Sequence, residues 1–146
     1  MHYFKIIIVT FFLIVMPNAY SQCASFLPSG CKTALGNFVH DGNVSSTSLS
    51  EGELAELFKT FYADQTYRLV VCKSDNLPPV HLRVLDNAGR VLFDNKDYNY
   101  EQVWDFSVKS TQMLIIQMKV LALKKKEDNA LKENGCVAVF FGIDKN

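Results

Sequence analysis

The chain has 146 residues, 49% of them hydrophobic, which excludes a fully disordered protein and suits one domain with a single core. It carries 15 basic and 15 acidic residues, so its charge gives no basis for binding nucleic acid or a strongly anionic membrane surface. Nucleic acid is therefore not among the expected partners.

Residues 1–21 have the features of a secretory signal peptide. A positively charged flank precedes an apolar run at positions 6–16, and the small residues Ala19 and Ser21 occupy both positions that a signal peptidase reads. The run is shorter than the roughly 20 apolar residues that a membrane-spanning helix needs. We therefore expect a mature chain that begins at Gln22, has no membrane span and works in the periplasm or outside the cell.

Four cysteines follow the predicted signal peptide: Cys23, Cys31, Cys72 and Cys136. An even number of cysteines in an exported protein predicts disulfides. Three pairings exist, and the favoured one joins Cys72 to Cys136, both in β-like segments, and Cys23 to Cys31 across a short loop. Lipidation of Cys23 stays open because this residue closely follows the apolar run. Zinc binding is disfavoured because no C-x-x-C motif is present.

Residues 22–50 are rich in Ser, Gly, Asn and Thr and are predicted to be an irregular N-terminal lead-in with one short strand at 34–40. The Asp-Gly-Asn sequence at 41–43 is a turn signal. The predicted β-sandwich domain then spans 51–146. Within it, residues 51–62 fit either a helix or a strand, because several apolar residues stand at helical spacing; the resemblance described below favours a strand.

Short apolar segments alternate with turn signals from residue 67 onward. Apolar and polar residues alternate at 80–85, which is typical of a half-buried strand, and the Asp-Asn-Ala-Gly sequence at 86–89 indicates a hairpin turn. Strands are predicted at 67–72, 80–85, 90–93, 103–108, 113–120 and 137–143. This spacing predicts an all-β fold, an antiparallel β-sandwich of the jelly-roll type.

Several of these segments together resemble one type of exported protein. Residues 60–72 read as a strand, a turn that includes Gln65 and a strand that begins Tyr-Arg, and residues 84–95 read Val-Leu-Asp-Asn-Ala-Gly-Arg-Val-Leu-Phe-Asp-Asn, the hairpin of that type. The other resembling positions are Gly52, 104–106, 114–116 and 135–137. Over residues 52–143 the chain resembles the small exported β-sandwich proteins of Bacteroidetes-like bacteria and, more distantly, the bacterial pre-peptidase C-terminal domain. The resemblance implies a domain of a kind that is accessory or uncharacterised. Because no catalytic module is attached, it does not imply an accessory to an enzyme in the same chain.

No catalytic residues are predicted. The mature chain has two histidines, His40 and His81, without a G-x-S-x-G elbow or an H-E-x-x-H motif. His40 stands beside a turn signal. His81 lies in an alternating segment, where it is expected on the polar face together with Arg83.

Asp94, Asn95 and Asp97 are candidate calcium ligands, because they place three oxygen-bearing side chains in one loop. The competing interpretation is turn chemistry, in which Asp and Asn bind their own backbone. No other cofactor is expected. Tyr98 and Tyr100 are candidate ligand-binding residues beside this loop, although an aromatic row of this kind also suits the core of a sandwich.

These patterns predict a non-enzymatic binding or structural module of the cell envelope, whose partner is an envelope protein or a glycan. The alternative is a small metal-dependent or carbohydrate-active hydrolase, for which His81 and Asp94 are the residues to test. A third hypothesis is assembly with envelope proteins through an exposed sheet edge.

Overall fold

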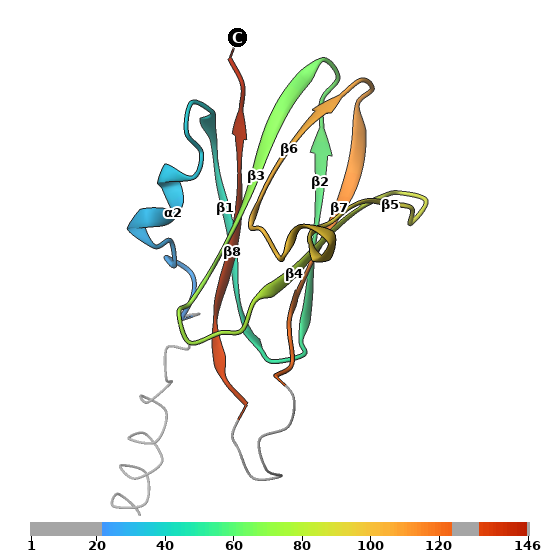
Figure 1. The fold of residues 1–146 in the computed structure, drawn as a ribbon. Helices are drawn as coiled ribbons and strands as arrows, with labels where there is room; N and C mark the ends of the chain where they lie inside the picture. The colour runs from blue at the N-terminus through green and yellow to red at the C-terminus, as the bar shows by residue number, and fades with distance from the viewer. Residues whose placement is uncertain (1–21, 124–131, 146) are drawn as a thin grey trace, which may run out of the picture.

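Two antiparallel sheets of four strands each face one another in the computed structural model, which describes residues 22–123 and 132–145 (Figure 1). The predicted signal peptide at 1–21 lies outside the described residues. The elements in chain order are α2 (Ser29–Thr33), β1 (Val39–Ser50), β2 (Leu54–Phe61), β3 (Gln65–Lys73), β4 (Val80–Asp86), β5 (Val91–Asp94), the 3₁₀ helix η1 (Asn95–Tyr98), β6 (Val103–Val108), β7 (Gln112–Val120) and β8 (Asn134–Ile143).

The strand order is that of a jelly roll. One sheet has the order β1-β8-β3-β6 and the other β2-β7-β4-β5. The first strand therefore pairs with the last, the second with the seventh, the third with the sixth and the fourth with the fifth, as in one long folded hairpin. The predicted all-β sandwich of jelly-roll type is confirmed, and the ambiguous segment at 51–62 contains strand β2.

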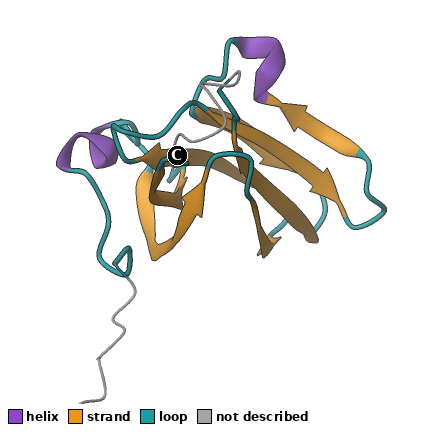
Figure 2. Ribbon diagram, turned by 90° about the horizontal axis from the view of Figure 1, so that it is seen from below, coloured by secondary structure: helices purple, strands orange, loops and turns teal. Residues whose placement is uncertain are grey.

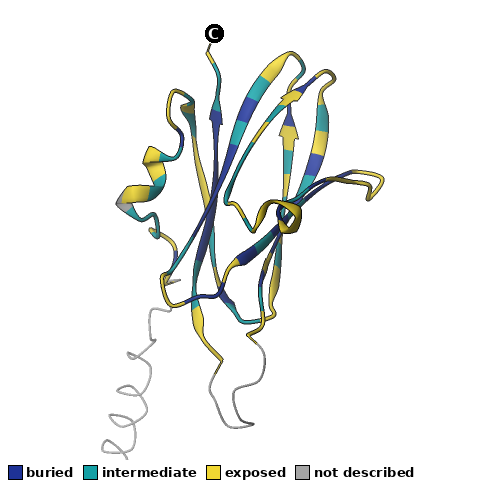
Figure 3. Cartoon of the chain, viewed as in Figure 1, coloured by how far each residue is buried: buried dark blue, intermediate teal, exposed yellow. Residues whose placement is uncertain are grey.

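The main core lies between the two sheets and comes from the alternate, inward-facing positions of each strand. Leu82 and Val84 of β4 meet Val139 and Phe141 of β8 in one buried cluster. Strand β8 is buried along most of its length. The edge strand β2 alternates between exposed and partly buried positions, and the edge strand β1 is mostly exposed or partly buried (Figure 3). In the strands that show it, the alternation of apolar and polar residues in the sequence therefore predicts correctly which side chains face the core.

A second apolar cluster lies on the outer face of the β1-β8-β3-β6 sheet. Residues 23–38, which we call the N-terminal arm, cover this face, and the helix α2 of the arm lies apart from η1 in both views (Figures 1 and 2). Leu35 of the arm packs with Val70 of β3 and Phe140 of β8. Strands β3 and β8 are consequently buried on both faces, which explains their uninterrupted apolar runs.

The disulfide pairing differs from the predicted one. Cys23 bonds to Cys136 and Cys31 bonds to Cys72, with Cα atoms 5.4 and 6.3 Å apart, so both bridges join the arm to the sheet. Cys72 lies opposite Ala138 rather than Cys136. Diagonal neighbours in a sheet are about 7–8 Å apart, beyond the usual Cα separation of a disulfide. The bridge at Cys23 also occupies the thiol that lipidation would require.

The prediction that residues 22–50 are irregular is wrong, and so is the start of the sandwich at 51. Residues 39–50 form β1, an edge strand that pairs with β8. Their side chains are mostly polar because only Leu49 is fully buried on this edge, so no apolar alternation marks the strand. The predicted turn at 41–43 is a bulge inside β1, where Gly42 has a φ of +93°.

No helix among residues 22–123 and 132–145 is both long and apolar enough to cross a membrane.

Candidate functional site

Aromatic rings close the side of the sandwich between β5 and β6, the edge strands of opposite sheets. The ring centroids of Phe93 and Trp104 are 4.6 Å apart, and Trp104 stacks in turn on Phe106 at 4.3 Å. Tyr98 of η1 extends the stack outward, 5.4 Å from Phe93. Each aromatic pair stabilises the fold by about 0.5–1.5 kcal/mol in addition to the free energy of burying the rings. The stack therefore holds η1 against both sheets.

The side chain of Asn95 anchors η1 to β4. It is fully buried, its Oδ1 accepts a hydrogen bond from the backbone N–H of Leu82, and its Nδ2 donates to the carbonyls of Val80 and Glu101. The carboxylate of Asp94 caps the start of η1 by accepting from a backbone N–H. The loop is therefore fixed to the sheet at its base.

The backbone after η1 is strained where the chain turns toward β6. Asn99 and Tyr100 are consecutive non-glycine residues with positive φ, 53° and 58°. A left-handed backbone costs a residue with a Cβ about 1–2 kcal/mol, and it is uncommon for a bulky residue such as Tyr. The backbone N–H of Tyr100 donates to the carbonyl of Asn95, which holds the turn closed. Strain of this kind clusters at functional sites.

A hollow of about 340 Å³ opens beside this loop, and we call it the η1 hollow. Its lining residues are Arg68, Phe93, Tyr98, Glu101, Val103, Trp104 and Asp105. The Tyr98 side chain is exposed, and the Glu101 carboxylate and the Trp104 indole N–H make no hydrogen bond to any residue that the structure describes. Neither polar group is buried away from solvent, so both can bind a ligand.

The Arg68 guanidinium at the rim of the hollow donates hydrogen bonds to the protein from all three of its nitrogens. Its Nε and Nη2 donate to the two carboxylate oxygens of Asp105 at 2.7 Å each, and its Nη1 donates to two backbone carbonyls of the arm. The hydrogen bond to Asp105 raises the pKa of Arg68, against a smaller effect of burial. Because these two charges cancel, Glu101 leaves the hollow with a net negative charge.

The two candidate tyrosines have different surroundings. Tyr98 is 59% exposed and lines the η1 hollow. Tyr100 is half-buried, and its ring meets the imidazole of His81 edge-on at 6.1 Å. Trp104 and Phe106 pack against the main core. The aromatic row therefore belongs to the core at its inner end and to the hollow at its outer end.

The three candidate calcium ligands do not share one site. Asp94 contacts His81 and the N–H of Lys96, Asn95 is buried against backbone groups, and Asp97 is exposed. The Asp94 carboxylate thus performs the turn chemistry that was the competing interpretation, whereas the Asn95 amide joins the loop to the backbone of β4. Calcium binding stays a prediction, and this geometry does not favour it.

His81 and Asp94 form a pair on the outer face of the β2-β7-β4-β5 sheet. Nε2 of His81 lies 2.7 Å from Oδ1 of Asp94, and Nε of Arg83 lies 3.8 Å from the other carboxylate oxygen. Burial raises the pKa of Asp94, but the N–H of Lys96, His81 and Arg83 together lower it more, so the pKa lies below its usual value. Among the described residues no serine hydroxyl contacts His81.

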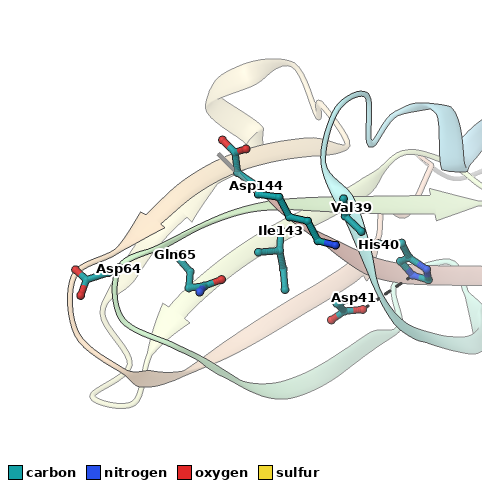
Figure 4. A pocket seen from close by; sticks show the side chains of 8 residues that line it. Val39, His40, Asp41, Asp64, Gln65, Ile143 and Asp144 are labelled. Carbon is teal, nitrogen blue, oxygen red and sulfur yellow. Dashed lines mark ion pairs between the residues drawn. The ribbon is translucent and has the colours of Figure 1, made fainter.

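A second hollow, of about 580 Å³, lies where β1, the start of β3 and the end of β8 meet (Figure 4). Nε2 of His40 is 4.0 Å from Asp41, and Asp41 is paired with Lys59 at 2.8 Å. The carboxylates of Asp64 and Asp144 point away from the His40 ring in Figure 4. No group of three His, Cys, Asp or Glu side chains in the described part of the chain could hold a metal. The η1 hollow is the better candidate site because its lining includes an exposed aromatic ring, Tyr98, and the described residues that line this second hollow include no Phe, Tyr or Trp.

Sequence reasoning found Tyr98 but missed the charged rim of the hollow. Arg68 and Asp105 are directly opposite each other on β3 and β6. Each is a charged residue within an apolar strand. The sequence therefore contained a signal for this ion pair, because opposite charges on adjacent strands commonly pair. Glu101 had no such signal, since its position follows from the fold of the η1 loop.

No family model matches the chain, and no curated protein matches its sequence. One similar solved structure is PliG of Aeromonas hydrophila, a periplasmic inhibitor of g-type lysozyme. The TM-score is 0.49 at 12% sequence identity, and the match covers 69% of this chain and 84% of that one. A likeness at this level assigns neither a family nor a function, and the resemblance to pre-peptidase domains gains no support from these comparisons.

Proposed function

We propose that this protein is a non-enzymatic binding module of the cell envelope and that the η1 hollow is its ligand site. The observation that carries the proposal is an exposed ring, Tyr98, at a firmly anchored loop. Beside it are two polar groups, on Trp104 and Glu101, that have no hydrogen-bond partner among the described residues. A pre-organised site loses less conformational entropy when it binds. The two disulfides support a place outside the cytoplasm, because such bonds persist in oxidising compartments.

The chemistry of the hollow favours binding over catalysis. Hydrolysis of a glycosidic bond commonly uses two carboxyl groups with separate roles. Of the two carboxylates here, Asp105 is held by both branches of the Arg68 guanidinium, which leaves Glu101 without a second acid or base.

The test is co-sedimentation of the purified protein with an insoluble cell-envelope fraction, followed by mass spectrometry of the captured material. We expect the wild type to sediment and Tyr98→Ala to weaken binding about two- to tenfold, since a stacking contact contributes about 0.5–1.5 kcal/mol. Tyr62→Ala is the matched control, because Tyr62 is also exposed (64%) but lies outside the hollow. A wild type that stays in the supernatant, or a Tyr98→Ala protein that sediments equally well, contradicts the proposal.

A hydrolase is the second candidate function, and the short contact between His81 and Asp94 favours it. A carboxylate that orients an imidazole is one part of many acid–base sites. Chromogenic glycosides and esters offered to the wild type, His81→Ala and Asp94→Asn provide the test. Turnover by the wild type that both substitutions abolish, and that Tyr62→Ala retains, would establish the hydrolase in place of the binding module.

A further inference from the structure

We infer that the η1 hollow binds a neutral pyranose ring of a polysaccharide, an inference that rests on the proposed binding function and names its ligand. The free ring face of Tyr98 suits a sugar ring. The polar groups disfavour a cationic side chain, and the charge of the hollow disfavours an acidic ligand.

Tyr98 offers the stacking surface. One face of its ring lies against Phe93, at an interplanar angle of 22°, and the side chain is 59% exposed. Trp104 has no such surface, because its ring is stacked between Phe93 and Phe106. A pyranose ring presents C–H groups on one face, and these suit the electron-rich face of an aromatic ring. A sugar would therefore extend the stack by one further ring.

The polar groups suit a ligand that both donates and accepts hydrogen bonds. The indole N–H of Trp104 can only donate, and the carboxylate of Glu101 accepts. A sugar hydroxyl can satisfy either group. A lysine or arginine side chain could lie over Tyr98 and pair with Glu101, but it would leave the indole N–H without an acceptor.

The charge of the hollow selects against acidic ligands. Arg68 is neutralised by Asp105 and also bound to backbone carbonyls, so it has little capacity to attract a phosphate or a uronic acid. Glu101 adds a negative charge beside the stacking surface, and within the described part of the chain no cation pairs with it. Neutral hexoses and N-acetylhexosamines are therefore the favoured class.

The size and rigidity of the hollow suit a single ring. Its volume of about 340 Å³ lies near the lower end of the range for small-molecule sites, so neighbouring rings of a polysaccharide would extend into solvent. The anchor at Asn95 and the left-handed pair Asn99 and Tyr100 fix the loop before the ligand arrives. Less conformational entropy is then lost on binding.

Intrinsic fluorescence gives a direct test, because the chain has one tryptophan and Trp104 lines the hollow. The full mature protein is titrated with two neutral probes, tetrameric N-acetylglucosamine and tetrameric glucose, and with tetrameric galacturonic acid and trilysine. We expect saturable binding of at least one neutral probe, with Tyr98→Ala weakening it about two- to tenfold and Tyr98→Phe, which keeps the stack, leaving the affinity close to that of the wild type. Glu101→Gln should weaken binding several-fold, and Tyr62→Ala should leave it unchanged.

Three results would overturn the inference. The first is no saturable response to either neutral probe, and the second is binding of a neutral probe that Tyr98→Ala does not weaken. The third is binding of tetrameric galacturonic acid or trilysine that is tighter than binding of the neutral probes. Circular dichroism of Tyr98→Ala checks that the variant is folded. If these titrations fail while envelope co-sedimentation still depends on Tyr98, the binding module stands and only its ligand class is wrong. If co-sedimentation fails as well, the proposed function is wrong.

Discussion

Asp86 is a buried carboxylate that organises the hairpin between β4 and β5. It is 4% exposed, and its Oδ1 accepts hydrogen bonds from the backbone N–H groups of Ala88 and Arg90. Its Oδ2 accepts from Nε of Arg90 at 2.6 Å. The backbone hydrogen bond from Arg90 is the main cause that lowers the pKa of Asp86 below its usual value.

This shift predicts a pH-dependent stability. Because the pKa is lower in the folded chain than the unfolded value of about 3.9, the ionised carboxylate stabilises the fold above about pH 4, and this contribution is lost as the pH falls through the folded-state pKa. Asp86→Asn should therefore lower the urea midpoint at pH 7 but approach the wild type at pH 3. A difference in midpoint that stays constant from pH 7 to pH 3 would contradict this account.

Asn95 should matter through hydrogen bonding rather than through metal binding. Asn95→Ala leaves three buried or partly buried backbone groups without their partner, and an unsatisfied buried group costs about 1–3 kcal/mol. We expect a loss of about 2–4 kcal/mol in the free energy of unfolding, measured by chemical denaturation. Asp97→Ala is the control, since an exposed residue should change stability by less than about 0.5 kcal/mol. Equal effects of the two substitutions would count against this role.

At the scale of elements, the N-terminal arm packs on β8 because β8 has a glycine at the contact. A Cβ on Gly142 would lie 2.6 Å from Cβ of Phe38 and 2.8 Å from Cδ2 of Leu35. The arm thus approaches the sheet closely at its C-terminal end. This approach also brings its carbonyls within reach of Arg68 at the rim of the η1 hollow.

Gly142→Ala should separate the arm from the sheet. Overpacking of this kind costs about 1–3 kcal/mol, so we expect a lower free energy of unfolding and faster amide exchange in the arm. Gly30→Ala in α2 is the matched control, because no atom lies within 4 Å of the added Cβ. A wild-type melting temperature for Gly142→Ala would show that the arm does not pack as described.

At the scale of the whole molecule, two covalent bonds join the arm to the sandwich. Non-reducing peptide mapping should recover one peptide pair with Cys23 and Cys136 and another with Cys31 and Cys72. Removing the second bridge with a Cys31→Ser, Cys72→Ser double variant should cost about 2–4 kcal/mol, because the unfolded chain gains freedom. Recovery of a peptide that joins Cys72 to Cys136 would refute the pairing.

The alternation of apolar residues by itself determined the sandwich, because a strand places successive side chains on opposite faces. The Asp-Asn-Ala-Gly turn at 86–89 was equally readable, since its residues suit the backbone of a tight hairpin. Strand β1 was not readable, because the polar residues of an edge strand take their partners from β8, far along the chain. The local pattern of 39–50 therefore carries no strand signal.

Only the tertiary structure decided the disulfide pairing and the η1 hollow. The pairing depends on which outward-facing positions of β3 and β8 lie under the arm, and the sequence does not contain this register. The hollow depends on β5 and β6 lying at the same side of two opposed sheets, so that Phe93 meets Trp104. Residue types show which side chains can stack or pair, but contacts between distant segments arise only when the sheets close on one core.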